Sequence, residues 1–277
     1  MVDIRKSLGE LRGEWESCTA CDLGVRRQDV EGPLIFGQGD RRGIMFIGDG
    51  PVEEDDAAEG PFSDKAGALL RNTIGKLGLP TTYFTYTVAC RSCEHAVDGA
   101  GAPMYRKDRR GVALPMIRDR TPSPPQIAAC RPRLLEEIYL VDPILIVTLG
   151  AEATSAVMGK SISITSERGK TRQLDIPGSW YLPSRTDKKQ VWARKVKGVL
   201  TLPSEQNTVG YLVLPTLHPA YALRMWADKR PDNPLDLFLE DLRLAANVYD
   251  KYMQEALGII PSERDVNKSD VLGDPNG

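Results

Sequence analysis

Cysteine is the residue type whose spacing in this sequence most directly suggests chemistry. Two Cys-x-x-Cys pairs, Cys18/Cys21 and Cys90/Cys93, are accompanied by a fifth cysteine, Cys130. Four thiolates at this spacing can hold a zinc ion, and four thiolates can equally hold a 4Fe–4S cluster, because both use the same ligand chemistry. The spacing alone leaves zinc and iron–sulfur open. In either case one cysteine is surplus, and a buried free thiol is its expected fate.

A carboxylate and an imidazole each follow a predicted strand. The apolar run 44–47 ends in Gly48-Asp49-Gly50-Pro51, where the glycines let the backbone turn sharply and approach a ligand. His218, one of only two histidines, follows a second apolar run. Ligands bind outside the carboxyl ends of the strands in open α/β sheets, which makes Asp49 a candidate catalytic residue, and His218 also lies at the end of a strand. An ordinary surface turn and a structural histidine are the alternatives.

The composition predicts a chain with a substantial core and no overall charge preference. Hydrophobic residues make up 41% of the 277 residues, and 36 Lys+Arg nearly cancel 38 Asp+Glu. Net charge therefore indicates neither a nucleic acid nor an acidic partner, and only local patches could do so. The sequence has no signal-peptide start and no run of 18 apolar residues. With an odd number of cysteines, these features favour a soluble cytoplasmic protein with no membrane partner.

Strands that alternate with helices predict an α/β fold, with four central parallel strands flanked by helices on both faces. The strands are expected at about 44–48, 83–89, 144–149 and 211–214, and the helices at 3–16, 64–78, 124–140, after Gly150, and at 234–256. Residues 22–43 are expected to be mainly loop. We expect one domain, 1–256, with insertions at about 94–124 (a long loop) and 160–208, and a disordered tail over 257–277.

Several blocks occur in the same order as in a known family. They read CTAC, then IMFIGDGP with EGPFSDKAG, a strand ending in ACR, PPQIAACRPRLLEEI, ILIVTLGAEA and LPTLHPAYALR. This series resembles the family 4 uracil-DNA glycosylases, which carry a 4Fe–4S cluster, over roughly residues 8–160 and 210–250. The resemblance implies a monomer with the three-layer uracil-DNA glycosylase-like fold and DNA as its partner. It also implies an iron–sulfur cluster on Cys18, Cys21, Cys90 and Cys130, with Cys93 the spare and zinc the alternative.

The resemblance also implies roles for the other candidate residues. Glycosidic cleavage leaves an oxocarbenium-like sugar and an anionic base, after the base has been flipped out of the stack. Asp49 would meet the water or the sugar cation, and His218 would donate to the departing base. The base would stack on Phe62, beside Gly48, Gly50, Pro51 and Tyr86. DNA contacts are expected from a loop at Leu217–Arg224 and from the basic insertions, through Tyr221, Leu223, Arg224, Arg106, Arg109, Arg110, Lys188 and Lys189.

Two departures from the family pattern concern the base. The family usually reads Gly-Glu-Ala-Pro-Gly where this chain has Gly-Asp-Gly-Pro-Val at 48–52, so the carboxylate side chain is one methylene shorter. Tyr86 stands where the family carries an asparagine that reads the uracil edge, and a phenol cannot reproduce that bidentate pattern. We therefore predict a monofunctional DNA glycosylase for uracil or a modified pyrimidine, hydroxymethylated or glucosylated as in virus DNA, in repair or in defence. An ordinary uracil-repair glycosylase and a non-catalytic iron–sulfur DNA-binding protein are the alternatives.

Overall fold

The computed structural model describes residues 7–79, 81–177, 195–196, 199–200, 208–227, 230, 232–257 and 271. Lys188 and Lys189, and the predicted disordered tail apart from Leu257 and Val271, lie outside the described residues.

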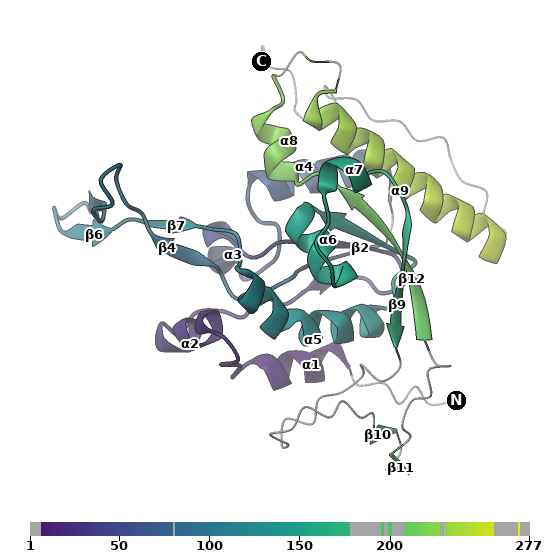
Figure 1. Ribbon diagram of the computed structural model, residues 1–277, viewed down its shortest axis with the longest axis horizontal. Coiled ribbons are helices and arrows are strands. Elements are labelled where there is room, and N and C mark those ends of the chain that lie inside the picture. Colours follow the sequence, from purple (N-terminus) through teal and green to yellow (C-terminus); the bar gives the residue numbers. More distant parts are fainter. Residues whose placement is uncertain are drawn as a thin grey trace.

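A mixed six-stranded sheet forms the centre of the molecule, in the order β1-β3-β2-β8-β12-β9 (Figure 1). The four inner strands run parallel, as predicted, and β1 and β9 add antiparallel edges that the prediction of four strands missed. The edge strands are either very short or inside an insertion, so the sequence carried no strong periodic signal for them. Their bounds are β1 Gln38–Gly39, β2 Ile44–Gly48, β3 Thr82–Tyr86, β8 Leu145–Leu149, β9 Arg172–Pro177 and β12 Thr208–Thr216.

Helices cover both faces of this sheet, and alternate residues of each strand serve the two faces. On one face Phe46 packs with α4, α8 and α9, and on the other Ile47 packs with α5 and α6. A third apolar cluster joins α1, α2 and α5 beneath the second face. The helices are α1 Leu8–Trp15, α2 Asp22–Asp29, α3 Glu53–Ala58, α4 Lys65–Lys76, α5 Pro124–Val141, α6 Ala151–Met158, α7 Ile164–Glu167, α8 Pro219–Arg224 and α9 Pro234–Leu257.

Local chemistry explains where the long helices begin. Asp64 caps α4 by accepting a hydrogen bond from the Gly67 N–H at 2.7 Å, which satisfies one of the free amides of the first turn. In α5, Ser123 is the capping residue and Pro124 occupies the first helical position, where its missing N–H costs nothing. Both starts agree with the sequence-based prediction. Among the described helices, none is long and apolar enough to cross a membrane.

Three segments differ from the predicted loops. Within 22–43, residues 22–29 form helix α2, in which only one side of the short helix is buried, so its periodicity is weak. Residues 94–124 are not a loop but a β-hairpin arm, defined here as residues 93–119. The segment 217–224 is largely helix α8, because Pro219 starts a helix on the His218 cap. The strands of the arm are β4 Cys93–His95, β5 Tyr105–Lys107, β6 Ala113–Pro115 and β7 Ile117–Asp119. Outside the arm, β10 Lys195–Val196 pairs with β11 Val199–Leu200 in a separate two-stranded sheet.

Candidate active site and cysteine pocket

Asp49 is fixed at the carboxyl end of β2 by neighbouring backbone and by helix α6. The Thr87 N–H donates to the Gly48 carbonyl at 2.9 Å, and the Thr87 hydroxyl donates to the Asp49 carbonyl. The carboxylate accepts a hydrogen bond from the Ala153 N–H, in the first turn of α6, at 3.0 Å. The pKa of Asp49 is raised to about 7, mainly by burial and also by the nearby negative charge of Glu152, while the hydrogen bond from the Ala153 N–H acts in the opposite direction. The carboxyl group therefore titrates near neutrality.

His218 follows β12 and is the capping residue of α8. Its Nδ1 accepts a hydrogen bond from the Ala220 N–H at 3.2 Å, so the proton of the neutral ring lies on Nε2. The pKa of His218 is lowered to about 4, mainly by burial. The negative charge of Asp64 opposes this shift, and the positive charge of Arg224 adds to it. At neutral pH the imidazole is therefore uncharged and has one N–H left to donate.

Gly150, between β8 and α6, brings the two groups together. Its φ of 101° is a conformation that side chains rarely adopt. A Cβ atom placed there would stand 3.4 Å from the Cβ of His218 and 3.6 Å from Oδ1 of Asp49. Both candidate side chains are half-buried and flank this glycine, so they lie close together at the carboxyl end of β8. A carboxyl group and an imidazole are thus found at the sheet edge predicted for ligands.

Tyr86 and Phe62 pack against each other next to this edge. Their ring centroids are 4.7 Å apart with an interplanar angle of 27°, and both side chains are buried. Phe62 has a left-handed backbone, with φ of 58°. The Tyr86 hydroxyl accepts a hydrogen bond from the Phe62 N–H at 2.8 Å and donates to Oδ2 of Asp55 at 2.8 Å. The phenol thus has its single donor in use, and its ring covers one face of Phe62.

Asp55 is the fully buried anchor of this arrangement. Besides the Tyr86 hydroxyl, its carboxylate accepts hydrogen bonds from the Val52 N–H at 2.9 Å and the Ser63 N–H at 2.8 Å. These three donors stabilise the carboxylate against burial, which by itself raises its pKa. Gly48 leaves room for the two rings, because a Cβ atom there would lie 2.8 Å from Phe62 and 2.9 Å from Tyr86. Gly50 faces Val88 and Pro122 instead, and Pro51 is buried.

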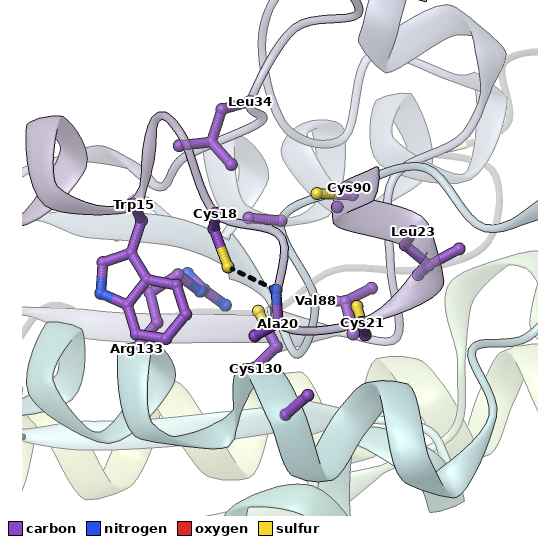
Figure 2. Close-up of a pocket in the computed structure, with 13 residues that line it drawn as sticks. Trp15, Cys18, Ala20, Cys21, Leu23, Leu34, Val88, Cys90, Cys130 and Arg133 are labelled. Carbon is purple, nitrogen blue, oxygen red and sulfur yellow. Dashed lines mark hydrogen bonds between the residues drawn. The ribbon is translucent and has the colours of Figure 1, made fainter. Parts of the chain in front are cut away.

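Four cysteines line one cavity. Figure 2 shows Cys18, from the loop after α1, with Cys21, at the start of α2, Cys90, after β3, and Cys130, on α5. Cys93 lies in β4 and does not line the cavity, so the two Cys-x-x-Cys pairs do not make one four-cysteine site. None of the five forms a disulfide. Within the described ranges, no three Cys, His, Asp or Glu side chains are arranged to hold a single metal ion.

Two buried guanidinium groups approach the cysteines of this cavity. The Nε atoms of Arg27 and Arg133 are buried and have no hydrogen-bond partner among the residues that the structure describes. The charge of Arg133 interacts with Cys130, and that of Arg27 with Cys90. Burial raises the pKa of the Cys90 thiol to about 12, with contributions from Cys130 and Cys21. Four thiols beside two cations fit an anionic group that is bound through sulfur. An iron–sulfur cluster is such a group, and its ligands lie farther apart than the ligands of a single metal ion.

The predicted DNA-contacting residues divide into three groups. Arg106, Arg109 and Arg110 are exposed on the hairpin arm. On α8, Tyr221 and Arg224 are exposed, whereas Leu223 packs against the core. Lys188 and Lys189 lie outside the described residues, as noted above.

Sequence reasoning missed two residues of the site. Asp55 belongs to an acidic run that is typical of solvent exposure, and Glu152 lies in a matched block where nothing singles it out.

Comparison with known proteins identifies the family. Residues 36–243 match the model of the uracil DNA glycosylase superfamily. The chain is 30% identical to the type-4 uracil-DNA glycosylase of Thermotoga maritima over 253 residues, which is 89% of this chain and 97% of the relative. It is also 30% identical to the type-4 uracil-DNA glycosylase of Sulfurisphaera tokodaii, covering 78% of this chain and 76% of the relative. The match spans the strands that carry Asp49 and His218, and the chain therefore belongs to the uracil-DNA glycosylase superfamily.

Proposed function

We propose that this protein is a monomeric, monofunctional DNA glycosylase that flips a base out of DNA and hydrolyses its N-glycosidic bond, leaving an abasic site. The observation that carries the proposal is the meeting of Asp49 and His218 across Gly150, in a member of this superfamily. The two side chains suit the two charges that develop during cleavage, a cationic sugar and an anionic base.

Asp49 serves the sugar side of the reaction. In its ionised form the carboxylate stabilises the oxocarbenium-like sugar or accepts a proton from the attacking water. The Ala153 N–H donates to Oδ1 of Asp49. This hydrogen bond fixes the orientation of the carboxylate and therefore of its other oxygen. A pKa of about 7 leaves enough of the ionised form at neutral pH and makes the group a competent proton acceptor.

His218 serves the base side. Because Nδ1 is occupied by the Ala220 N–H, Nε2 presents its hydrogen to an oxygen of the departing base. The neutral ring donates a hydrogen bond without carrying a charge, so it stabilises the anionic base without protonating it. Helix α8 fixes the direction of this donor, since His218 is its capping residue.

The substrate we favour is a modified pyrimidine, such as hydroxymethylated or glucosylated cytosine or uracil. The support for this is the state of Tyr86, whose hydroxyl is held by Asp55 and Phe62 and whose ring stacks on one face of Phe62. A plain uracil would find no amide at this position to read its edge. Selection would then rest on a substituent of the base that reaches the surrounding residues. The relatives named as uracil-DNA glycosylases make uracil the competing substrate.

A 4Fe–4S cluster on Cys18, Cys21, Cys90 and Cys130 is part of the proposal. These thiols come from three segments, the 18–21 pair, Cys90 and Cys130, and share a cavity with Arg133, which suits an anionic cluster. Such a cluster would supply structural cross-linking of α1, α2, β3 and α5. Zinc is the alternative, and metal analysis of the purified protein distinguishes the two.

Base release from matched duplexes containing uracil, hydroxymethyluracil, hydroxymethylcytosine or glucosylated hydroxymethylcytosine tests the proposal. We expect release of at least one modified base in preference to uracil. Release of uracil alone would return the protein to ordinary uracil repair. No release from any duplex, with DNA binding intact, would leave a non-catalytic iron–sulfur DNA-binding protein.

A further inference from the structure

The hairpin arm contains two turns of the same geometry and different charge. In residues 98–102 and 108–112, the leading aspartate exchanges backbone hydrogen bonds across the turn, and its Oδ1 accepts two more from N–H groups inside it. The corresponding distances agree within 0.1 Å, at 2.9–3.0 Å in the first turn and 2.8–3.0 Å in the second. Gly101 and Gly111 close the turns with φ of 82° and 81°.

Only the second turn is cationic. Its central residues are Arg109 and Arg110, where the first turn has Gly99 and Ala100. Because the first turn forms with glycine and alanine, the two arginine side chains are not needed for the shape of the second. Two long cationic side chains at an exposed tip therefore need an explanation outside the fold of the arm.

Basic residues at the base of the arm are paired, and those at its far end are not. Arg91 forms ion pairs with Asp119 at 2.5 Å and Glu53 at 2.9 Å, and Arg118 pairs with Glu94 at 2.6 Å. Four cations in and next to the second turn are exposed, and none forms an ion pair or side-chain hydrogen bond with another described residue: Arg106, Lys107, Arg109 and Arg110. Arg106 also lines a cavity with Glu53 and Arg91, so it lies between the base of the arm and the turn. The far end of the arm thus carries uncompensated positive charge.

The base of the arm is anchored beside the candidate active site. Glu53, which pairs with Arg91, begins α3 four residues after Asp49. Pro122, just after the arm, lies against Gly50, where an added Cβ atom would be 3.0 Å from its ring. From this anchor β4 and β7 project away from the sheet, with β6 toward the far end (Figure 1). A polymer bound at Asp49 can therefore extend along the arm.

We propose that the 108–111 turn, with Arg106 and Lys107, is a DNA-binding tip that contacts phosphates flanking the base attacked at Asp49. This inference rests on the proposed function for the identity of the polymer. Phosphates are the partner of matching charge, because unpaired arginine side chains can donate to their oxygens and displace counterions. Tyr105, 61% exposed beside these cations, adds an aromatic surface for a sugar or base. The tip contributes affinity, and it does not touch the reacting atoms.

The double variant Arg109→Gly/Arg110→Ala tests this, because it gives the second turn the Asp-Gly-Ala-Gly sequence of the first. Binding to a labelled unmodified DNA duplex is measured by fluorescence anisotropy over a series of salt concentrations. We expect the slope of log affinity against log salt to become shallower by about two, roughly one for each lost phosphate contact. The control variant Arg42→Ala/Lys251→Ala removes the same charge from exposed sites elsewhere and should keep the slope of the unaltered protein.

Two results would overturn the proposal: an unchanged slope in the turn variant, or an equal fall in both variants, which would be an effect of net charge alone. Single-turnover base release at saturating enzyme and low salt is measured in parallel and should be unchanged in the turn variant. If the slope of the turn variant is shallower but the unaltered protein releases no base from any duplex, the DNA-binding tip is supported and the glycosylase function is rejected. If the unaltered protein releases a base but the slope of the turn variant is unchanged, the glycosylase function is supported and the DNA-binding tip is rejected.

Discussion

Asp49 and His218 show how one environment prepares two groups for different roles. Burial disfavours charge on both, which raises the pKa of Asp49 to about 7 and lowers that of His218 to about 4. At neutral pH the site therefore combines a carboxyl group that can exist in either state with a permanently neutral imidazole. A pair of groups whose pKa values are moved in this way is a mark of acid–base chemistry.

The pH dependence of base release should report the titration of Asp49. Because the ionised carboxylate is the active form in the proposed reaction, the single-turnover rate should rise with pH around 7 and fall to about a tenth of its plateau at pH 6. Glu152→Gln removes a negative charge that raises this pKa, so its midpoint should move down by about half a pH unit. Glu152→Asp keeps the charge and should keep the midpoint. An unchanged midpoint in Glu152→Gln would show that the pH profile reports a group other than Asp49.

The same carboxyl group should cost stability. Its folded-state pKa lies above the ordinary value of 3.8, so the folded protein binds this proton more tightly than the unfolded chain. The free energy of unfolding should then decrease as pH rises from about 4 to 7. Asp49→Asn removes this loss, and its Tm should exceed that of the unaltered protein at pH 8, by a few degrees, but not at pH 4. Base release should fall by about 100-fold to 10,000-fold while DNA binding remains.

His218 combines a cap with a proposed catalytic donor, and two variants separate them. Asparagine can still accept the Ala220 N–H and cap α8, whereas alanine cannot. Both His218→Asn and His218→Ala should lose about 100-fold to 1,000-fold in base release, the effect of one hydrogen-bond donor to a developing anion. Only His218→Ala should lower the free energy of unfolding, by about 1 kcal/mol. Full activity in His218→Asn would show that the imidazole acts only as a cap.

At the scale of elements, the regular parts could be predicted and the exposed ones could not. Strand 44–48 and helix 65–76 follow from an apolar run and a capped amphipathic pattern, and the family resemblance is confirmed. The arm has no apolar face to bury, so its sequence lacks the period of two that indicates a strand. The partner of Tyr86 could not be found either, because Asp55 lies 31 residues away and belongs to an acidic run that reads as solvent-exposed.

The contact between β3 and α3 through Tyr86 predicts a change of substrate. Tyr86→Asn removes the ring from the face of Phe62 and supplies an amide at the same position, so uracil release should appear or increase at least tenfold relative to modified bases. Tyr86→Phe keeps the ring and loses only the hydroxyl, and it should leave uracil release unchanged. Both variants remove a donor from buried Asp55 and should unfold at lower temperature. If Tyr86→Asn stays folded and gains no uracil release, another element excludes uracil.

At the scale of the molecule, the cysteine cavity joins segments that the sheet alone does not hold together. Cys130→Ala should abolish the bound iron and visible absorbance and lower the Tm, because the cluster would connect α5 to the loop after α1 and to the end of β3. Cys93→Ala should retain both iron and Tm, since Cys93 is outside the cavity. Equal iron loss in the two variants would contradict the proposed ligand set. Zinc instead of iron in the purified protein would favour the alternative of a zinc site.

Arg133 connects the cysteine cavity to the edge of the sheet where base binding is proposed. It is fully buried on α5, pairs with Glu137 at 2.5 Å, and donates to the Tyr86 carbonyl at 2.5 Å while lining the cavity. Glu137 in turn accepts from the hydroxyl groups of Tyr83 and Thr85. The end of β3, where Tyr86 meets Phe62, is thus held by the same guanidinium that faces Cys130. Loss of the cluster should therefore disturb the base site as well as stability.

Arg133→Lys tests this coupling against Arg27→Lys, because lysine keeps the charge but cannot make the planar set of contacts. Arg27 interacts with Cys90 and donates hydrogen bonds to the backbone carbonyls of Glu16 and Gly32, and among the described residues no hydrogen bond joins it to β3. Both variants should lose iron, measured per folded protein, whereas Arg133→Lys alone should also reduce base release beyond its loss of iron, by about tenfold, as its contact with the Tyr86 carbonyl is lost. If base release in both variants simply follows iron content, the cluster and the base site communicate through global stability and not through Arg133.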